Sequence, residues 1–375
     1  MVRMSCPERS VAPLLLPGVS AAHLTPQYWI SRSADADRVW LDQQDLRDLN
    51  ARWMDPHNGV PIFDLEHVDR DAINTAVKRR LTYLRQALAS GEYQLSDRQQ
   101  KILDSGGLST EESASLNPSL FVAQTEIAIY CGPVPYRVIR AKDPLKLNRN
   151  LCSTARRNET LQTLERWSNG MQLARTHYVM GWIASDVPLS PPGPSDLLSP
   201  AEWPTRSLSR RRVIARAFEL LNQPYGWGGE NGGLDCSRFV MEVFRSFGLM
   251  LPRHSGQQAR AAPYVIEVPR DATHRERLIM IDHAQRHGIV LLHMPGHIGI
   301  YLGRDHRNIP MMIHAFTEYA ESCRPTFCRE TRRQVHRVTV STLSLGAGTQ
   351  TGSFLGRVDR ISTLGNNHSL LTQAR

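Results

Sequence analysis

Two segments near the start of the chain have the apolar spacing of amphipathic helices. In residues 38–55, apolar side chains recur at intervals near three and four residues, at Leu41, Leu46, Leu49 and Trp53. A second stripe of this kind runs through residues 70–90, at Ile73, Val77, Leu81, Leu84 and Leu88. We therefore expect an N-terminal helical region over residues 38–115.

From about residue 119 the pattern changes to short runs rich in β-branched and aromatic residues. Turn formers such as Cys131-Gly132-Pro133 and Ser168-Asn169-Gly170 separate these runs. Short strands divided in this way are typical of a small barrel, which we expect over residues 116–187. Residues 188–206 follow as a proline-rich segment, which predicts a semi-rigid linker and a domain boundary.

A thiol is placed at the start of a helix in the third region, residues 207–342. The glycines of residues 223–234 cannot belong to the interior of a stable helix or strand, so this segment is a loop. Asp235 then serves as an N-cap, and the apolar residues that follow it fall on one helical face. Unpaired backbone N–H groups and the helix macrodipole would lower the pKa of the Cys236 thiol there. The Asp235 carboxylate opposes this effect unless other groups bind it.

Two histidines follow on predicted strands. Residues 289–302 predict two strands joined by Pro295-Gly296, with His297 at the start of the second, and His314 lies in a third apolar run. A cysteine followed by two strand-borne histidines is the order expected of a circularly permuted papain-like enzyme, in which one histidine is the base and the other orients it. Taken singly, a cysteine at a helix start or a histidine in an apolar strand is more often a packed core residue, and we interpret His293 as structural.

Composition and charge narrow the classes of partner. The 45 Lys and Arg residues against 36 Asp and Glu give a net charge of +9, which favours nucleic acid, a membrane surface or an anionic polymer such as cell wall. The chain has no zinc-finger or ribonucleoprotein motif, so we expect no nucleic-acid partner. No apolar run reaches the length of a transmembrane helix. The sequence predicts no oligomeric state.

The six cysteines are too few for a disulfide scaffold in a chain of this length. None of their spacings is that of a zinc site, so we expect no metal and no other cofactor. A disulfide between Cys323 and Cys328 stays open for an exported protein.

Both ends of the chain are expected to be peripheral. Residues 1–37 form a leader in which Arg3, an apolar run over residues 11–19 and small residues near Ala21 resemble a weak secretory signal. An unstructured leader is the equal alternative. Residues 343–375 are rich in Ser, Thr, Gly and Asn and predict a loosely ordered or peripherally packed tail.

Five motifs in order make the third region resemble the NlpC/P60 cysteine peptidase family, over about residues 208–320. They are Tyr225-Gly226-Trp227-Gly228-Gly229, Asp235-Cys236-Ser237, Leu251-Pro252-Arg253 with Ser255 and Gln258, Gly296-His297 through Gly303, and Ile313-His314-Ala315. The preceding β-rich module is similar to the bacterial SH3 (SH3b) domain of a subgroup. The implied fold class is α+β: a permuted papain-like catalytic domain preceded by a small SH3-like β-barrel and an N-terminal helical region.

The resemblance implies a thiol peptidase of peptidoglycan stem peptides, cutting between γ-D-glutamate and a diamino acid, diaminopimelate or lysine. By position, Cys236 is the nucleophile, His297 the general base and acid, and His314 the orienting residue. The implied substrate-binding residues are Tyr225, Asp235, Ser237 and Ser255. The implied partner is peptidoglycan or its released muropeptides. The implied location is the periplasm, the cell envelope or the exterior, with cytoplasmic muropeptide recycling as the alternative.

Two positions depart from the family pattern. Arg238 stands where a small residue usually follows Cys-Ser; it would bind a carboxylate if it faced the cleft and would do nothing if it faced solvent. His254 replaces the usual acid before Ser255, which puts a strict preference for a free N-terminal amine in doubt. Two other functions stay open: a non-catalytic wall-binding protein, and an amidase or acyltransferase on the same fold.

Overall fold

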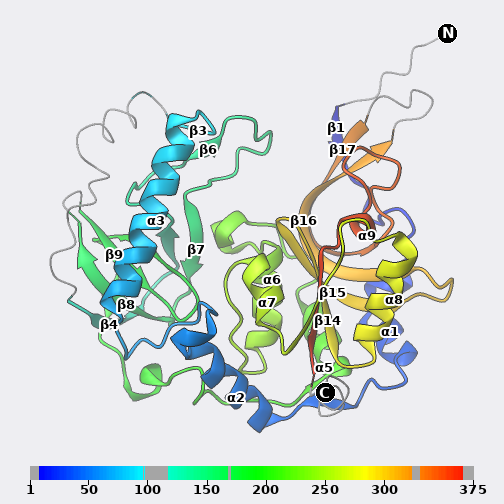
Figure 1. Cartoon of the computed structure of the whole chain (residues 1–375), viewed down its shortest axis with the longest axis horizontal. Coiled ribbons are helices and arrows are strands. Elements are labelled where there is room, and N and C mark those ends of the chain that lie inside the picture. Colours follow the sequence, from blue (N-terminus) through cyan, green and yellow to red (C-terminus); the bar gives the residue numbers. More distant parts are fainter. Residues whose placement is uncertain (1–7, 96, 98–116, 168–169, 323–329, 366–375) are drawn as a thin grey trace. The chain divides into compact units, whose positions relative to one another are not determined.

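A computed structural model of the chain describes residues 8–95, 97, 117–167, 170–322 and 330–365. The chain forms two compact units (Figure 1). The first unit consists of Met1–Val60, Pro204–Gly226 and Gly233–Arg375. The second unit consists of Pro61–Trp203 and Trp227–Gly232. The predicted thiol and both predicted catalytic histidines belong to the first unit.

A seven-stranded sheet lies at the centre of the first unit. Its order is β1-β17-β16-β15-β14-β18-β13, antiparallel except for the parallel pair β1 and β17. The strands are β1 (Arg9–Val11), β13 (Tyr264–Glu267), β14 (Ile289–Met294), β15 (His297–Arg304), β16 (Pro310–Ser322), β17 (Glu330–Thr342) and β18 (Arg360–Leu364). The three strands predicted around His297 and His314 are confirmed as β14, β15 and β16.

Helices cover both faces of this sheet. Figure 1 shows α6 (Cys236–Arg245) and α7 (Ser255–Ala261) on one side of it and α8 (His274–Gln285) on the other. Alternation along β14 explains this, because Leu292 and Met294 pack in one core cluster with Ile281 of α8. The remaining helices and short strands of this unit are η1 (Ala21–Leu24), α1 (Pro26–Arg32), β2 (Val39–Leu41), α2 (Gln43–Met54), η2 (Pro56–Asn58), β12 (Leu208–Ser209), α5 (Arg210–Glu219) and α9 (Phe354–Arg357).

The second unit is built on an antiparallel sheet and one long helix. The sheet has the order β11-β4-β8-β9-β10-β5-β7. Its strands are β4 (Ser119–Ala123), β5 (Ile127–Tyr130), β7 (Leu151–Ala155), β8 (Thr160–Arg166), β9 (Met171–Arg175), β10 (Met180–Ala184) and β11 (Leu189–Ser190). The other elements are α3 (Arg70–Ala89), β3 (Tyr93–Gln94), β6 (Ile139–Arg140), η3 (Pro194–Leu197) and η4 (Trp227–Gly232). A disulfide joins Cys131, after β5, to Cys152 in β7.

The two helices predicted near the start of the chain are confirmed as α2 and α3. They belong to different units, however. In α2, Asn50 donates a hydrogen bond of 2.7 Å to the carbonyl oxygen of Gly248 and accepts one of 3.0 Å from the N–H of Met250, which ties this helix to the first unit. In α3, Leu81 and Leu84 pack in the core of the second unit. Helix periodicity predicts the elements but does not reveal which core each one joins.

Both chain ends differ from their predicted peripheral position. Ile361 and Leu364 of β18 are fully buried, and this strand lies between β14 and β13. Near the other end, β1 pairs with β17, and Leu16 is buried in the core of the first unit. The polar composition of the C-terminal segment conceals its strand, because buried polar residues such as Ser362 hydrogen-bond within the core. The predicted pair Cys323 and Cys328 lies outside the described residues.

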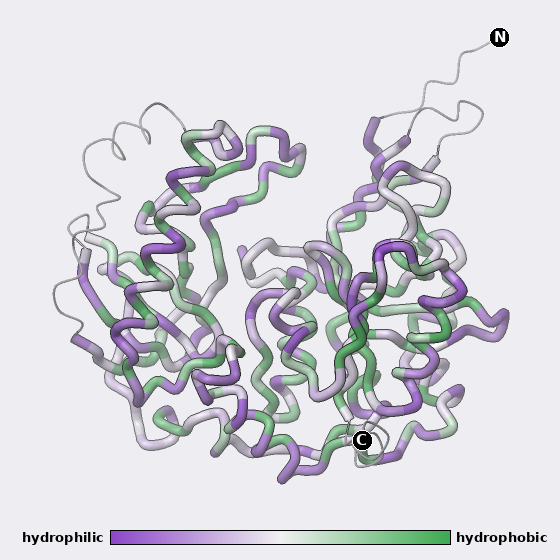
Figure 2. The backbone as a smooth tube through the Cα atoms, viewed as in Figure 1, coloured by the Kyte–Doolittle hydropathy of each residue, from purple (hydrophilic) through white to green (hydrophobic). Residues whose placement is uncertain are grey.

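Hydrophobic stretches follow the central strands of the first unit in Figure 2, in agreement with their burial. In the described part of the chain, no helix combines the length and apolar character needed to cross a bilayer.

Replacing Ile361 by Ala tests the place of β18 in the core. The change removes a fully buried side chain and should lower the free energy of unfolding by about 2–5 kcal/mol. The matched control is Ile279→Ala on α8, where the side chain is 58% exposed and the expected change is within about 0.5 kcal/mol. Urea denaturation measures both, and equal midpoints for the two variants would contradict the position of β18.

Candidate active site

The thiol of Cys236 lies in the first turn of α6, as the sequence predicts. The carboxylate of Asp235 caps this helix by accepting a hydrogen bond of 2.8 Å from the backbone N–H of Arg238. The helix is buried from Cys236 to Phe244, and Cys236 itself is 8% exposed. The sequence thus places the thiol correctly at a helix N-terminus.

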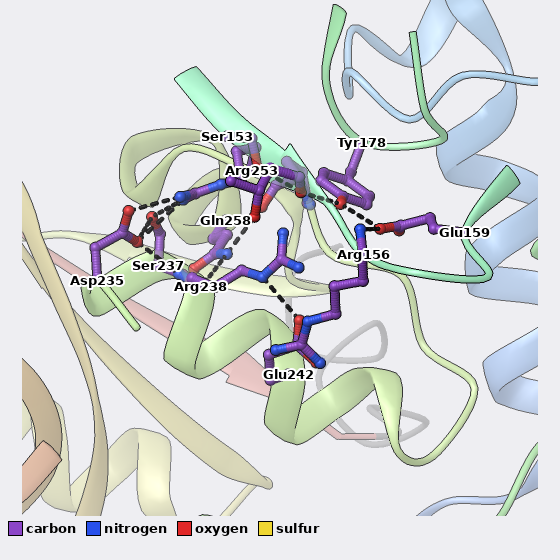
Figure 3. A network of polar contacts seen from close by, with 12 residues as sticks. Ser153, Arg156, Glu159, Tyr178, Asp235, Ser237, Arg238, Glu242, Arg253 and Gln258 are labelled. Atoms are coloured by element: carbon purple, nitrogen blue, oxygen red, sulfur yellow. Dashed lines mark hydrogen bonds and ion pairs between the residues drawn. The ribbon is translucent and has the colours of Figure 1, made fainter. Parts of the chain in front are cut away.

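The Asp235 carboxylate is fully engaged by neighbouring side chains (Figure 3). Arg253 donates to both of its oxygens, with Nη1 at 3.0 Å from Oδ1 and Nη2 at 2.6 Å from Oδ2. The Ser237 hydroxyl donates to Oδ1 at 3.1 Å and accepts from Arg253 Nη1 at 2.8 Å. Burial raises the pKa of Asp235, but the charge and hydrogen bonds of Arg253 outweigh that effect, and the net pKa is lowered. The carboxylate is therefore ionised and paired.

Arg253 and Gln258 contact the start of α6, although the sequence assigned no role to either residue. The Gln258 side-chain amide donates to the carbonyl oxygens of Ser237 and Pro252, both at 2.8 Å, so it ties the α7 region to the first turn of α6. One signal in the sequence could have pointed to Arg253. A buried N-cap carboxylate such as Asp235 needs a counter-ion, and Arg253 follows it 18 residues later, just after Leu-Pro.

The sequence left open whether the Arg238 side chain faces a cleft or solvent, and the structure shows neither arrangement. The Nε of Arg238 lies 2.8 Å from Oε1 of Glu242, one turn further along α6. Both side chains are buried. The guanidinium is therefore paired with a carboxylate on its own helix, an arrangement visible in the sequence as an i,i+4 pair.

The thiol lies beside the segment that carries His297. Its Sγ donates to the carbonyl oxygen of Gly296 at 3.9 Å, and the backbone N–H of Ile298 also hydrogen-bonds to the sulfur. Within the described residues, the thiol makes no hydrogen bond to the His297 ring. The structure therefore brings Cys236 to the backbone on both sides of His297.

His297, the first residue of β15, and His314, within β16, form a hydrogen-bonded pair. Nε2 of His297 lies 2.6 Å from Nδ1 of His314, and Nε2 of His314 lies 2.9 Å from the Ser341 hydroxyl. Two phenyl rings hold the pair: His314 stacks on Phe316, and His297 stacks on Phe354. This hydrogen bond is the contact that the predicted relation requires; that one histidine orients the other stays a prediction.

Burial keeps the Cys236 thiol and both imidazoles neutral. Burial, and after it the Asp235 charge, raises the pKa of Cys236 to about 12. Burial, and after it the charge of Arg357, lowers the pKa of His297 to about 3. Burial and the neighbouring His297 likewise place the pKa of His314 well below its ordinary value. The expected lowering of the thiol pKa by the helix start is therefore wrong for this state, because desolvation outweighs the macrodipole.

The two remaining predicted substrate-binding residues lie on segments of the first unit that flank these groups. The half-buried Tyr225 is fixed through its backbone N–H, which donates to the carbonyl oxygen of His336 at 2.9 Å. Ser255 is the first residue of α7, the helix that carries Gln258. His254 before it is exposed. His293, interpreted as structural, bonds the Asp359 carboxylate through Nδ1 at 2.6 Å.

One group of residues in the described part of the chain has the spacing of metal ligands. The candidate ligand atoms of His23, Asp305 and His306 lie within 4.8 Å of one another. Nδ1 of His23 accepts the backbone N–H of Ser20 at 3.1 Å, so the proton of the neutral ring sits on Nε2, which faces Asp305 at 3.6 Å. A ligand nitrogen needs a lone pair, so this arrangement fits a histidine–carboxylate contact and not a cation site.

Replacing Arg253 by Leu should leave the Asp235 carboxylate buried without a counter-ion. We expect a loss of about 3–5 kcal/mol in the free energy of unfolding. The control is Arg211→Leu, which breaks an exposed bidentate pair with Asp37 and should cost far less, because solvent screens both charges. Chemical denaturation of both variants measures the difference. Similar losses would show that the buried Asp235 pair contributes no more to stability than the exposed pair.

The alkylation rate of Cys236 should keep rising with pH far beyond neutrality. Only the thiolate reacts, so a pKa of about 12 makes the rate climb about tenfold per pH unit from pH 7 to pH 10. N-acetylcysteine serves as the control, since an ordinary thiol levels off above its pKa of about 8.5. Iodoacetamide labelling, read by peptide mapping at Cys236, gives the profile. A plateau that begins near pH 6 would instead show a resting thiolate–imidazolium pair.

Comparison with known proteins agrees with this geometry. Residues 222–338 match the NlpC/P60 family profile. The chain is 34% identical over 92 residues to the Gamma-D-glutamyl-L-lysine dipeptidyl-peptidase of Bacillus subtilis (strain 168). The aligned segment covers 24% of this chain and 28% of that protein. It is 31% identical over 108 residues to the Peptidoglycan endopeptidase RipB of Mycobacterium tuberculosis (strain ATCC 25618 / H37Rv). This alignment covers 24% of this chain and 39% of that protein.

The fold of the chain is also found in a solved structure. A novel NlpC/P60 endopeptidase from Photobacterium damselae subsp. piscicida superposes with a TM-score of 0.64 at 15% identity, over 95% of this chain and 99% of that one. At this identity the likeness concerns the fold alone. The profile match is what assigns residues 222–338 to an NlpC/P60 family domain.

Proposed function

We propose that the first unit is a cysteine peptidase acting on the peptides of peptidoglycan, with Cys236 as its nucleophile. The observation that carries the proposal is the placement of the thiol at the start of α6, against the backbone of residues 296–298. That segment presents His297, which His314 holds through a hydrogen bond of 2.6 Å. A thiol, a base and a group that orients the base are the parts needed for nucleophilic catalysis.

The hydrogen bonds around the histidines support a direction for proton transfer. If His314 accepts at Nδ1 from His297 Nε2–H, its own proton sits on Nε2 and is donated to Ser341. This chain of donors leaves Nδ1 of His297 with a free lone pair. We assign that atom as the general base, and His314 as the residue that fixes the tautomer.

The reaction then runs between neutral groups. The thiol turns from the Gly296 carbonyl towards His297, which takes its proton as the sulfur attacks the scissile carbonyl carbon. Backbone N–H groups in the first turn of α6 are assigned to stabilise the oxyanion, with Tyr225 as a further contact. His297 returns the proton to the leaving amine, and a water, activated by the same imidazole, hydrolyses the thioester.

We assign the scissile bond to γ-D-glutamate and the following diamino acid. The names of the curated relatives support this choice, since two are γ-D-glutamyl-L-lysine dipeptidyl-peptidases. Ser237 and Ser255 are the proposed contacts to the L-Ala-γ-D-Glu portion. Both oxygens of Asp235 are bonded to Arg253, so we assign Asp235 mainly to positioning the thiol and Ser237.

We further propose that the second unit contains an SH3b-type module and that the protein works outside the cytoplasm. Its antiparallel strands support the module assignment. The Cys131–Cys152 disulfide supports an oxidising compartment, where such bonds persist. A non-catalytic wall-binding role and acyl transfer to another amine are the alternatives that the following experiment separates.

Cys236→Ala should abolish cleavage of defined muropeptides while the protein stays folded. Mass spectrometry of the products reports the reaction, since hydrolysis adds one water at the γ-D-glutamyl bond and acyl transfer leaves an adduct on another amine. Ser246→Ala, at the other end of α6, is the matched control and should retain activity. EDTA should leave the rate unchanged. Full activity of Cys236→Ala would reject the nucleophile, and inactivity of the wild type would favour wall binding.

A further inference from the structure

A guanidinium group without a carboxylate partner lies beside the histidine pair. Arg357 is the last residue of α9, and its half-buried side chain makes no salt bridge within the described residues. Its Nε is buried and has no hydrogen-bond partner in that part of the chain. A desolvated cation in this state is costly unless an anion joins it. The group is therefore a candidate to receive an anion from outside the chain.

One phenyl ring connects Arg357 to His297. The guanidinium carbon of Arg357 lies 4.8 Å from the centre of the Phe354 ring. The His297 ring stacks on the same phenyl at 5.7 Å between centres, with an angle of 29° between planes. The charge of Arg357 also lowers the pKa of His297 and of His314, in agreement with this proximity. The cation thus borders the proposed general base.

A second arginine strengthens the positive field at this place. Arg332 of β17 donates to the Thr351 hydroxyl at 3.2 Å and has no carboxylate partner among the residues that the structure describes. After burial, the charge of Arg332 is the cause that lowers the pKa of Arg357. By contrast, the neighbouring Arg333 pairs with Glu321, and Arg9 pairs with Glu318. Two nearby guanidinium groups that lack carboxylates are suited to bind one.

The position beside His297 determines which part of the substrate would meet this charge. A general acid protonates the leaving amine, so the leaving group lies on the histidine side of the scissile bond. In the proposed reaction, that leaving group is the diamino acid. Lysine ends in a methylene ammonium, whereas diaminopimelate carries one more carboxylate at the corresponding carbon.

We propose that Arg357 binds the distal carboxylate of diaminopimelate and makes the enzyme prefer diaminopimelate-type over lysine-type stem peptides. This inference rests on the proposed function and deepens it. Arg332 supports the charge of the site from β17. Arg357 would contact the substrate and would take no part in proton transfer.

Three tripeptides of the form L-Ala-γ-D-Glu-X test the proposal. In them X is meso-diaminopimelate, its distal carboxamide, or L-lysine; the carboxamide removes the charge at nearly constant shape. The wild type should show kcat/KM for the diaminopimelate peptide about ten- to a hundredfold above the other two, the range expected for one charge-assisted contact. This comparison needs no variant and so does not depend on folding.

Arg357→Gln should reduce kcat/KM for the diaminopimelate peptide about ten- to a hundredfold and leave the carboxamide and lysine peptides within about threefold. Arg357→Lys should keep part of the preference, since it keeps the charge. Arg275→Gln, an exposed site on α8, controls for the loss of one positive charge. Equal wild-type rates on all three peptides, or an equal loss on all three in Arg357→Gln, would overturn this inference while leaving the peptidase assignment in place. Failure of the wild type to cleave any of them would overturn the proposed function and this inference with it.

Discussion

The ion pair between Asp235 and Arg253 is the interaction on which the arrangement of the site depends. One carboxylate caps α6, bonds the Ser237 hydroxyl and accepts both ends of a guanidinium, all in a buried place. The charge of this carboxylate opposes ionisation of the neighbouring Cys236 sulfur, and the charge of Arg253 acts in the opposite direction and reduces that effect. The helix can therefore begin directly at Cys236 with its N-cap carboxylate paired.

Burial has a second consequence for the chemistry. With the pKa of Cys236 raised to about 12 and that of His297 lowered to about 3, the resting pair is a thiol and a neutral imidazole. Charge separation is then expected only when a substrate carbonyl is in place to accept the attack. In the proposed function, a thiol that is unreactive in the resting state would suit the proposed location outside the cytoplasm, where oxidants would otherwise attack it.

Local patterns in the sequence predict which elements carry Cys236, His297 and His314, because each of these elements has a local signal. The N-cap at Asp235 and the apolar face after it place Cys236, and two apolar runs place His297 and His314 on adjacent strands. Long-range partners are less visible. Nothing in the composition of residues 343–365 reveals that β18 is a central strand, because its polar residues are satisfied only by segments distant in sequence.

The same limit applies to Arg253, to the pairing of Cys131 with Cys152 and to Arg357. The role of each depends on a neighbour that only the folded chain supplies. The direction of the thiol pKa also escaped prediction, since spacing shows the helix start and does not show the extent of burial.

The most direct test of the central claim is to trap the acyl-enzyme. The protein would be mixed with a defined muropeptide, quenched with acid within milliseconds and digested for peptide mapping by mass spectrometry. We expect a thioester on Cys236 that adds to its peptide the mass of the L-Ala-γ-D-Glu fragment minus one water. An acyl group on any other residue, or product release without an adduct at any time, would contradict this expectation.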